Sequence, residues 1–130
     1  MAKHLHLDVT GGIAGDMFLS AMLSACPELR GAMLDDLRAA GVLEHVTLSI
    51  DTVREKGFAA VRVKVTTASD APPTSQWRDI RAFIDGSGLD APVKARALAI
   101  FALLAEAEAT CHGVAPDEVH FHEIADWDSL

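Results

Sequence analysis

The chain has 130 residues, half of them apolar, which allows one folded domain with a core and excludes a disordered chain. Its 19 acidic and 11 basic side chains give a formal net charge of −8, which disfavours binding to nucleic acid or to an anionic membrane, because both need a basic surface. The longest apolar run, residues 95–107, is too short to cross a bilayer, and the first residues lack the apolar stretch of a signal peptide. We therefore expect a cytoplasmic protein in which Cys26 and Cys111 are free thiols.

The order of the predicted elements indicates an α+β fold. Alternating apolar residues predict strands at 3–9, 46–50, 61–65 and 119–123, and helical spacing predicts helices at 17–25, 28–40, about 76–84 and 93–111. The order β-α-α-β-β-α-α-β predicts a two-layer sandwich, with a small, mainly antiparallel sheet of about four strands and the helices on one side. Residues 1–130 are expected to form a single domain. Chain order leaves open whether the first and last strands are neighbours.

A glycine-rich turn links the first predicted strand to the first predicted helix. It contains Gly12 and Gly15, and a strand, such a turn and a helix N-terminus together can bind an anion. The glycine spacing matches neither a dinucleotide-binding nor a Walker A loop. Asp8 and Asp16 flank the turn and could instead hold a hard cation such as Mg²⁺, or a phosphate bridged by one. The alternative is that Asp16 does no more than favour the start of the helix, and that the glycines do no more than form the turn.

The last stretch of the chain is rich in possible metal ligands. His120 and His122 are two positions apart and would share one face of an extended segment, with Glu123 and Asp128 close by. Imidazole suits nickel, zinc, copper and iron, so this stretch could form a transition-metal site. The alternative is an edge strand, in which the two histidines face water while Phe121 fills the core.

Two stretches together resemble the LarC family of nickel-insertion proteins. They are Leu5-His6-Leu7-Asp8 through Gly12-Ile13-Ala14-Gly15-Asp16-Met17, and Val119-His120-Phe121-His122-Glu123-Ile124 followed by Asp128-Ser129. The resemblance covers essentially the whole chain, and the pair of motifs is far more specific than either one. It implies a CTP-dependent cyclometallation of the lyase class, which places nickel into pyridinium-3,5-bisthiocarboxylic acid mononucleotide. The product is the nickel-pincer nucleotide cofactor of lactate racemase.

The resemblance also implies what lies beyond these motifs. The family pattern continues past Asp128-Ser129 into a C-terminal region tied to CTP and to Mg²⁺ or Mn²⁺. The chain is therefore expected to be an N-terminal domain or fragment that is inactive alone. Its expected partners are the pyridinium mononucleotide and the C-terminal domain or a second polypeptide of the same protein, and a homo-oligomer is allowed.

We therefore assign expected roles to residues of the two motifs. They are His120, His122, Asp8 and Asp128 as metal ligands, Asp16 and Glu123 as catalytic groups, and Gly12 and Gly15 in cofactor binding. An open set of imidazoles and carboxylates would hold nickel and also release it, whereas soft thiolates would retain the metal. An imidazole must be neutral to ligate, so nickel uptake should weaken below about pH 6.5.

Two other classes of function remain open from the sequence. The first is a non-catalytic oligomerisation or scaffold domain, in which the histidines are structural and apolar helices pack against a second copy. The second is a divalent-metal-dependent hydrolase, with Asp8, Asp16, His120 and His122 as ligands and Glu123 as the base. The sequence has no helical H-E-x-x-H motif that would support the hydrolase.

Overall fold

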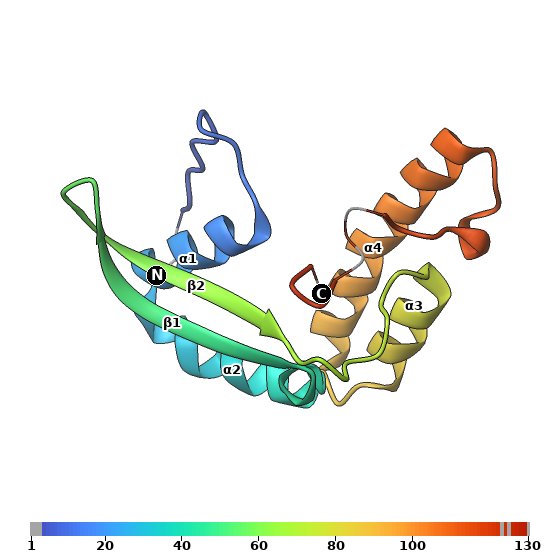
Figure 1. Ribbon diagram of the computed structural model, residues 1–130, viewed down its shortest axis with the longest axis horizontal. Coiled ribbons are helices and arrows are strands. Elements are labelled where there is room, and N and C mark those ends of the chain that lie inside the picture. The colour runs from blue at the N-terminus through green and yellow to red at the C-terminus, as the bar shows by residue number, and fades with distance from the viewer. Residues whose placement is uncertain (1–3, 123, 125, 130) are drawn as a thin grey trace.

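The protein is an α+β structure. The computed structural model describes residues 4–122, 124 and 126–129. Its helices and strands are α1 (Gly15–Ala25), α2 (Arg30–Ala39), β1 (Val46–Glu55), β2 (Phe58–Thr67), α3 (Trp77–Gly86) and α4 (Ala91–His112), joined in part by short 3-10 helices at Pro27–Leu29, Val42–Glu44 and Pro116–Glu118. Figure 1 shows α1 and α2 beside the β-hairpin and α3 and α4 as a second group, with the C-terminal segment between the hairpin and α4. Within the described residues, no helix is long and apolar enough to cross a membrane.

The sheet is an antiparallel hairpin of β1 and β2, which confirms the two central predicted strands. Its register runs from the pair Val46 and Thr67 to the pair Glu55 and Phe58. The turn consists of Lys56 and Gly57, which both have positive φ angles, of 48° and 90°. A two-residue turn of this kind matches the natural twist of the strands. It is shorter than the sequence indicated, and each strand accordingly extends to 10 residues.

Helices α1 and α2 pack against the hairpin. The backbone N–H of Val63 in β2 donates to the Ser20 hydroxyl oxygen of α1, at 3.0 Å. After α2, Gly41 adopts a left-handed φ of 79°, which ends the helix and turns the chain toward β1. Val42 and Val46, which follow this turn, are both buried in a small core beside α2. The hairpin is therefore the element against which both α1 and α2 pack.

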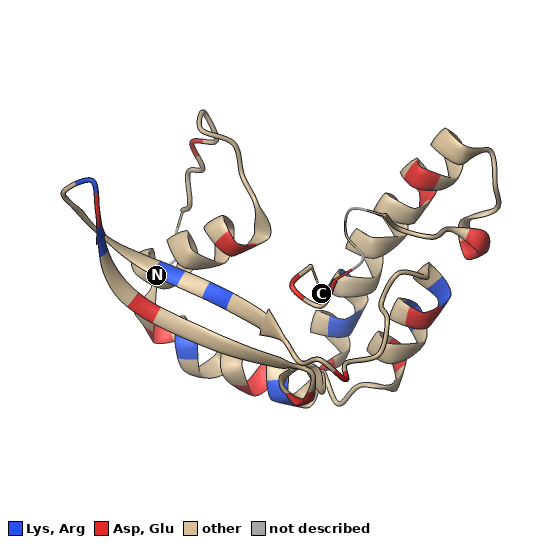
Figure 2. Cartoon of the chain, viewed as in Figure 1, with Lys and Arg blue, Asp and Glu red and all other residues tan. Residues whose placement is uncertain are grey.

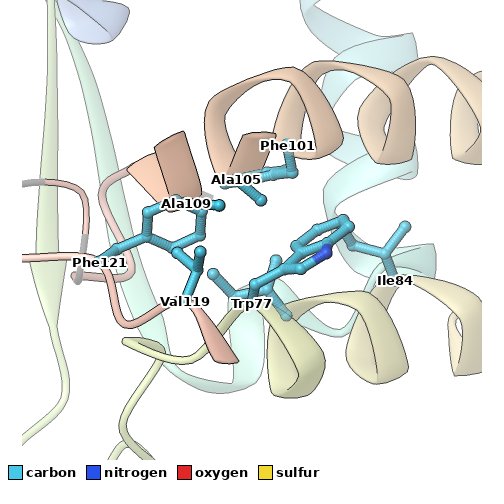
Figure 3. Close-up of a cluster of buried hydrophobic side chains, with 8 residues drawn as sticks. Trp77, Ile84, Phe101, Ala105, Ala109, Val119 and Phe121 are labelled. Carbon is cyan, nitrogen blue, oxygen red and sulfur yellow. The ribbon is translucent and has the colours of Figure 1, made fainter. Parts of the chain in front are cut away.

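A second core joins α3, α4 and the segment after α4. Its buried members are Trp77, Ile80, Ile84, Phe101, Ala105, Ala109, Val119 and Phe121. Figure 3 shows Val119 and Phe121 beside Ala109, a small residue of α4 that leaves room for them. The rings of Trp77 and Phe101 stack across the two helices, with centroids 6.3 Å apart. This core fixes the backbone around the two histidines of the last motif.

The predicted four-stranded sheet is not confirmed, because the described residues form a two-stranded sheet. Residues 4–9 have no strand pairing, and the last predicted strand is reduced to one antiparallel bridge between His120 and Gln76. Around that bridge, the Phe121 N–H donates to the Ser75 carbonyl oxygen at 2.7 Å. The alternation correctly predicted the burial of Val119 and Phe121, but Leu5, Leu7 and Val9 are more than half exposed, and the pattern could not identify a partner strand. The last segment pairs with the residues just before α3 and not with the hairpin. The predicted four-stranded sandwich with the order β-α-α-β-β-α-α-β is therefore not confirmed.

We predict that Phe121→Ala lowers the free energy of unfolding by about 3–5 kcal/mol, because it removes a buried aromatic ring and leaves a cavity. The Phe121 side chain is 2 % exposed. Phe58, at the hairpin turn, is 76 % exposed and is the matched control, so Phe58→Ala should change stability by less than about 0.5 kcal/mol. Urea denaturation measures both variants. Equal effects of the two substitutions would contradict the position of Phe121 in the core.

Candidate functional site

A cavity of about 550 Å³ lies between α1, the hairpin and the C-terminal segment. Both motif stretches line it, with Ala14, Gly15 and Asp16 from the first and Ile124, Trp127, Asp128 and Ser129 from the second. Most of the remaining lining is aliphatic and comes from α1, α2 and the two strands. Among the described lining residues, Asp16 and Asp128 are the charged ones, so the cavity carries negative charge at neutral pH. Figure 2 shows acidic positions in α1 and in the C-terminal segment. This arrangement attracts a cation or a cationic ring.

Asp16 reaches the cavity from the first turn of α1. Ala14 is the N-cap residue and cannot accept a hydrogen bond with its side chain. The Asp16 carboxylate instead accepts the backbone N–H of Met17 at 2.8 Å. A negative charge in this position is favourable, because it lies at the positive end of the helix dipole. Gly15 lies beside it on the cavity wall, so the turn predicted from the glycines does bring a helix N-terminus to this cavity.

Trp127 holds the C-terminal segment against the rest of the protein. Its indole N–H donates to the Pro72 carbonyl oxygen at 2.7 Å, and the side chain is 4 % exposed. The ring lies 4.3 Å from the His45 ring and meets Phe83 edge to face at 5.2 Å. These contacts place the neighbouring Asp128 at the cavity. Sequence reasoning missed this role, although a tryptophan next to a motif indicates burial with a partner for its N–H.

His120 and His122 lie on the other side of the last segment, away from the buried Phe121, as the alternation predicted. Their rings are 5.3 Å apart, and the His122 ring is 5.9 Å from the ring of His112 at the end of α4. They line a smaller cavity of about 190 Å³, together with Glu108, His112, Val114, Glu118 and Val119. The two cavities share none of their described lining residues. The two ends of the last motif therefore face different sites.

Asp8 and Gly12 belong to the turn before α1. The Thr10 hydroxyl donates to the Asp8 carboxylate, and the Thr10 backbone N–H donates to the same oxygen at 3.1 Å. The Thr10 hydroxyl, followed by its backbone N–H, holds the pKa of the Asp8 carboxyl below its ordinary value, so the group stays ionised. Gly12 has a φ of 88° and donates its N–H to the Val9 carbonyl oxygen at 2.8 Å. Its turn-forming role is clear, and its role in cofactor binding stays a prediction.

The residues predicted from the sequence thus fall into separate groups. Gly15, Asp16 and Asp128 line the large cavity, and His120 and His122 line the small one. Glu123 lies outside the described residues. Among the described residues, no three His, Cys, Asp or Glu side chains lie close enough together to hold one metal ion. The predicted set of His120, His122, Asp8 and Asp128 is therefore not assembled around a common point.

Comparison with known proteins gives consistent matches. The family model described as nickel insertion protein matches residues 5–130. The pyridinium-3,5-bisthiocarboxylic acid mononucleotide nickel insertion protein of a Nocardioides species is 39 % identical over 124 residues, which are 95 % of this chain and 31 % of that protein. A provisionally named nickel insertion protein of a Synechococcus species is 39 % identical over 128 residues, which are 98 % of this chain and 32 % of that protein. The chain thus spans about a third of the length of these relatives. No solved structure matches the chain.

We predict that Trp127→Phe speeds amide hydrogen exchange in residues 126–129, because phenylalanine retains an aromatic ring but cannot donate to the Pro72 carbonyl. Trp77→Phe is the matched control, since it changes a similarly buried indole in the core between α3 and α4. Exchange in residues 126–129 should stay unchanged in that variant. Mass spectrometry of the exchanged peptides measures both. An unchanged rate in Trp127→Phe would show that the hydrogen bond does not hold the segment.

Proposed function

This chain belongs to the nickel insertion protein family, and we propose that it takes up nickel and binds pyridinium-3,5-bisthiocarboxylic acid mononucleotide for nickel insertion. The proposal rests on the cavity that both motif stretches line, at Gly15 and Asp16 and at Asp128 and Ser129. Because the chain spans about a third of its relatives, the complete reaction is proposed for the full-length protein. The product is the nickel-pincer nucleotide.

The chemistry of the large cavity supports binding of this substrate. Its volume of about 550 Å³ lies within the usual range of about 300–1,000 Å³ for small-molecule sites. The aliphatic wall suits the flat pyridinium ring. The mononucleotide also carries thiocarboxylates and a phosphate, which are anionic, so Asp16 and Asp128 are proposed to hold a divalent cation that bridges the cavity to these groups. Gly15 lies at the first turn of α1, where the helix N-terminus favours an anionic group so bridged.

Nickel is a substrate of the proposed reaction, and His120 and His122 are its proposed ligands. Both side chains are exposed, and their rings are 5.3 Å apart. A cyclometallation forms a nickel–carbon bond and releases the proton of the broken C–H bond. We assign the acceptance of this proton to a carboxylate, with Asp16 and Glu123 as the candidates. Asp8 and Asp128 are proposed to bind or orient a cation or polar groups of the substrate.

Further parts of the proposal concern the remaining length of the relatives. Use of CTP with Mg²⁺ or Mn²⁺ is assigned to that region, because the family resemblance ties it there. A surface for such a partner is present on the described chain. Leu5, Leu7, Val9, Ile13 and Met17 are each more than half exposed. This apolar row supports contact with the C-terminal domain, a second polypeptide or a second copy of the chain.

We predict that Asp16→Asn combined with Asp128→Asn weakens binding of the pyridinium mononucleotide by about tenfold, which is about 1.4 kcal/mol. Both substitutions keep the side-chain shape but remove the negative charge of the cavity. Asp51→Asn is the control, because Asp51 is an exposed residue of β1 outside this cavity. Calorimetric titration measures all three proteins. Loss of affinity to the same degree in the control would contradict the cavity as the binding site.

Nickel binding separates the proposed function from the scaffold alternative. In His120→Ala combined with His122→Ala, we predict that calorimetry shows at least tenfold weaker nickel binding, while light scattering shows an unchanged state of assembly. In the parent chain, nickel should bind more weakly at about pH 5.5 than at about pH 7.5, because protonated imidazole cannot ligate. A broken assembly with unchanged nickel affinity would instead favour a scaffold. Equal affinity at the two pH values would contradict histidine ligation.

A further inference from the structure

We propose that His112 is a third nickel ligand, so that nickel is first captured by His112, His120 and His122 at the end of α4. This inference rests on the proposed nickel function of His120 and His122, and adds a ligand from another element. It also separates nickel capture from the large cavity, where the mononucleotide is proposed to bind.

The chain path brings the three histidines together. His112 is the last residue of α4, and Gly113, with a φ of 68°, ends the helix. The chain then turns through the short 3-10 helix Pro116–Glu118 and returns along the last turns of α4 (Figure 1). Val119 and Phe121, both 2 % exposed, anchor the returning segment in the core. The residues between and after these anchors are therefore held on the side that His112 occupies.

The two ring separations that involve His122 suit one shared ion. The His120 and His122 rings are 5.3 Å apart, and the His122 and His112 rings are 5.9 Å apart. Since a bond from a metal to an imidazole nitrogen is about 2.0–2.1 Å long, two rings on one ion have centres roughly 4.5–6 Å apart. In the described residues, no three ligand side chains yet converge on one point, so capture requires rotation of these side chains. The exposure of all three histidines permits that rotation.

The charge around the small cavity favours a cation. Glu108 and Glu118 line it, and its described lining includes no lysine or arginine. The end of α4 adds the negative pole of the helix dipole. The Glu108 carboxylate lies 3.3 Å from Nε2 of His112, one helical turn away. A carboxylate on one ring nitrogen orients a histidine and leaves the other nitrogen, here Nδ1, for the metal.

Three imidazoles around nickel would leave coordination positions open. An open site can pass its metal on, whereas a closed site retains it. The pyridinium substrate offers thiocarboxylate sulfurs, which are softer ligands than imidazole and can draw nickel away. The site at the end of α4 would thus be a loading site, and the large cavity would be the place of insertion.

The test is titration of the 130-residue chain with nickel chloride at about pH 7.5, combined with X-ray absorption spectroscopy of the nickel-loaded chain. His112→Ala should weaken nickel binding by at least about tenfold and reduce the number of imidazoles on nickel from three to two. Glu108→Gln should also weaken binding, within the 10- to 100-fold range usual for an orienting carboxylate, while three imidazoles remain. His4→Ala, which changes an exposed histidine of the N-terminal segment, should have no effect.

The outcomes distinguish this inference from the function on which it rests. Unchanged affinity and imidazole number in His112→Ala, with nickel binding lost in His120→Ala and in His122→Ala, would overturn the role of His112 and leave the proposed function standing. Unchanged binding in all three variants would overturn both. Circular dichroism of each variant verifies the fold, and a His112→Gln variant that keeps the helix but loses an imidazole should behave as His112→Ala does.

Discussion

The hydrogen bond from the Trp127 indole to the Pro72 carbonyl, at 2.7 Å, is the contact on which the candidate site depends. It joins the C-terminal segment to the connection between β2 and α3. Burial of the ring with Val42 and Val46 then brings this segment to the hairpin side of the molecule. Without that attachment, Asp128 would have no fixed position opposite Asp16. The two motif stretches, far apart in the sequence, line one cavity because a residue next to the second motif is buried.

The last motif serves two sites because its backbone is anchored twice. Phe121 is buried between the helices of the second core, and Trp127 is buried against the first. The histidines beside Phe121 lie with α4, and the carboxylate beside Trp127 lies with α1. This division suits the proposed function, because the proposed nickel ligands and the proposed substrate cavity can be filled separately. The last motif is also one short segment that connects the proposed loading site to the proposed insertion site.

Local features of the fold could be predicted from the sequence, and long-range pairing could not. The hairpin, the helices and the burial of Phe121 follow from alternation and helical spacing, which report the face on which a side chain lies. Those patterns carry no information on which segment is the partner, so residues 4–9 and 119–122 were expected in a sheet that the described residues do not form. For the site, Gly15, Asp16 and Asp128 were identified by motif. The residue type of Trp127 indicated burial, but its partners, and those of His112, depend on the tertiary path of the chain and could not be identified from the sequence.

Nuclear Overhauser effects from the Trp127 indole protons would show directly whether the C-terminal segment is attached beside α2 and β1. We expect cross-peaks to the methyl groups of Val42 and Val46, which share a buried cluster with Trp127. We also expect a cross-peak to the His45 ring, whose centroid is 4.3 Å from that of Trp127. Indole resonances with no such cross-peaks, in a chain that is otherwise folded, would contradict the cavity shared by Asp16 and Asp128.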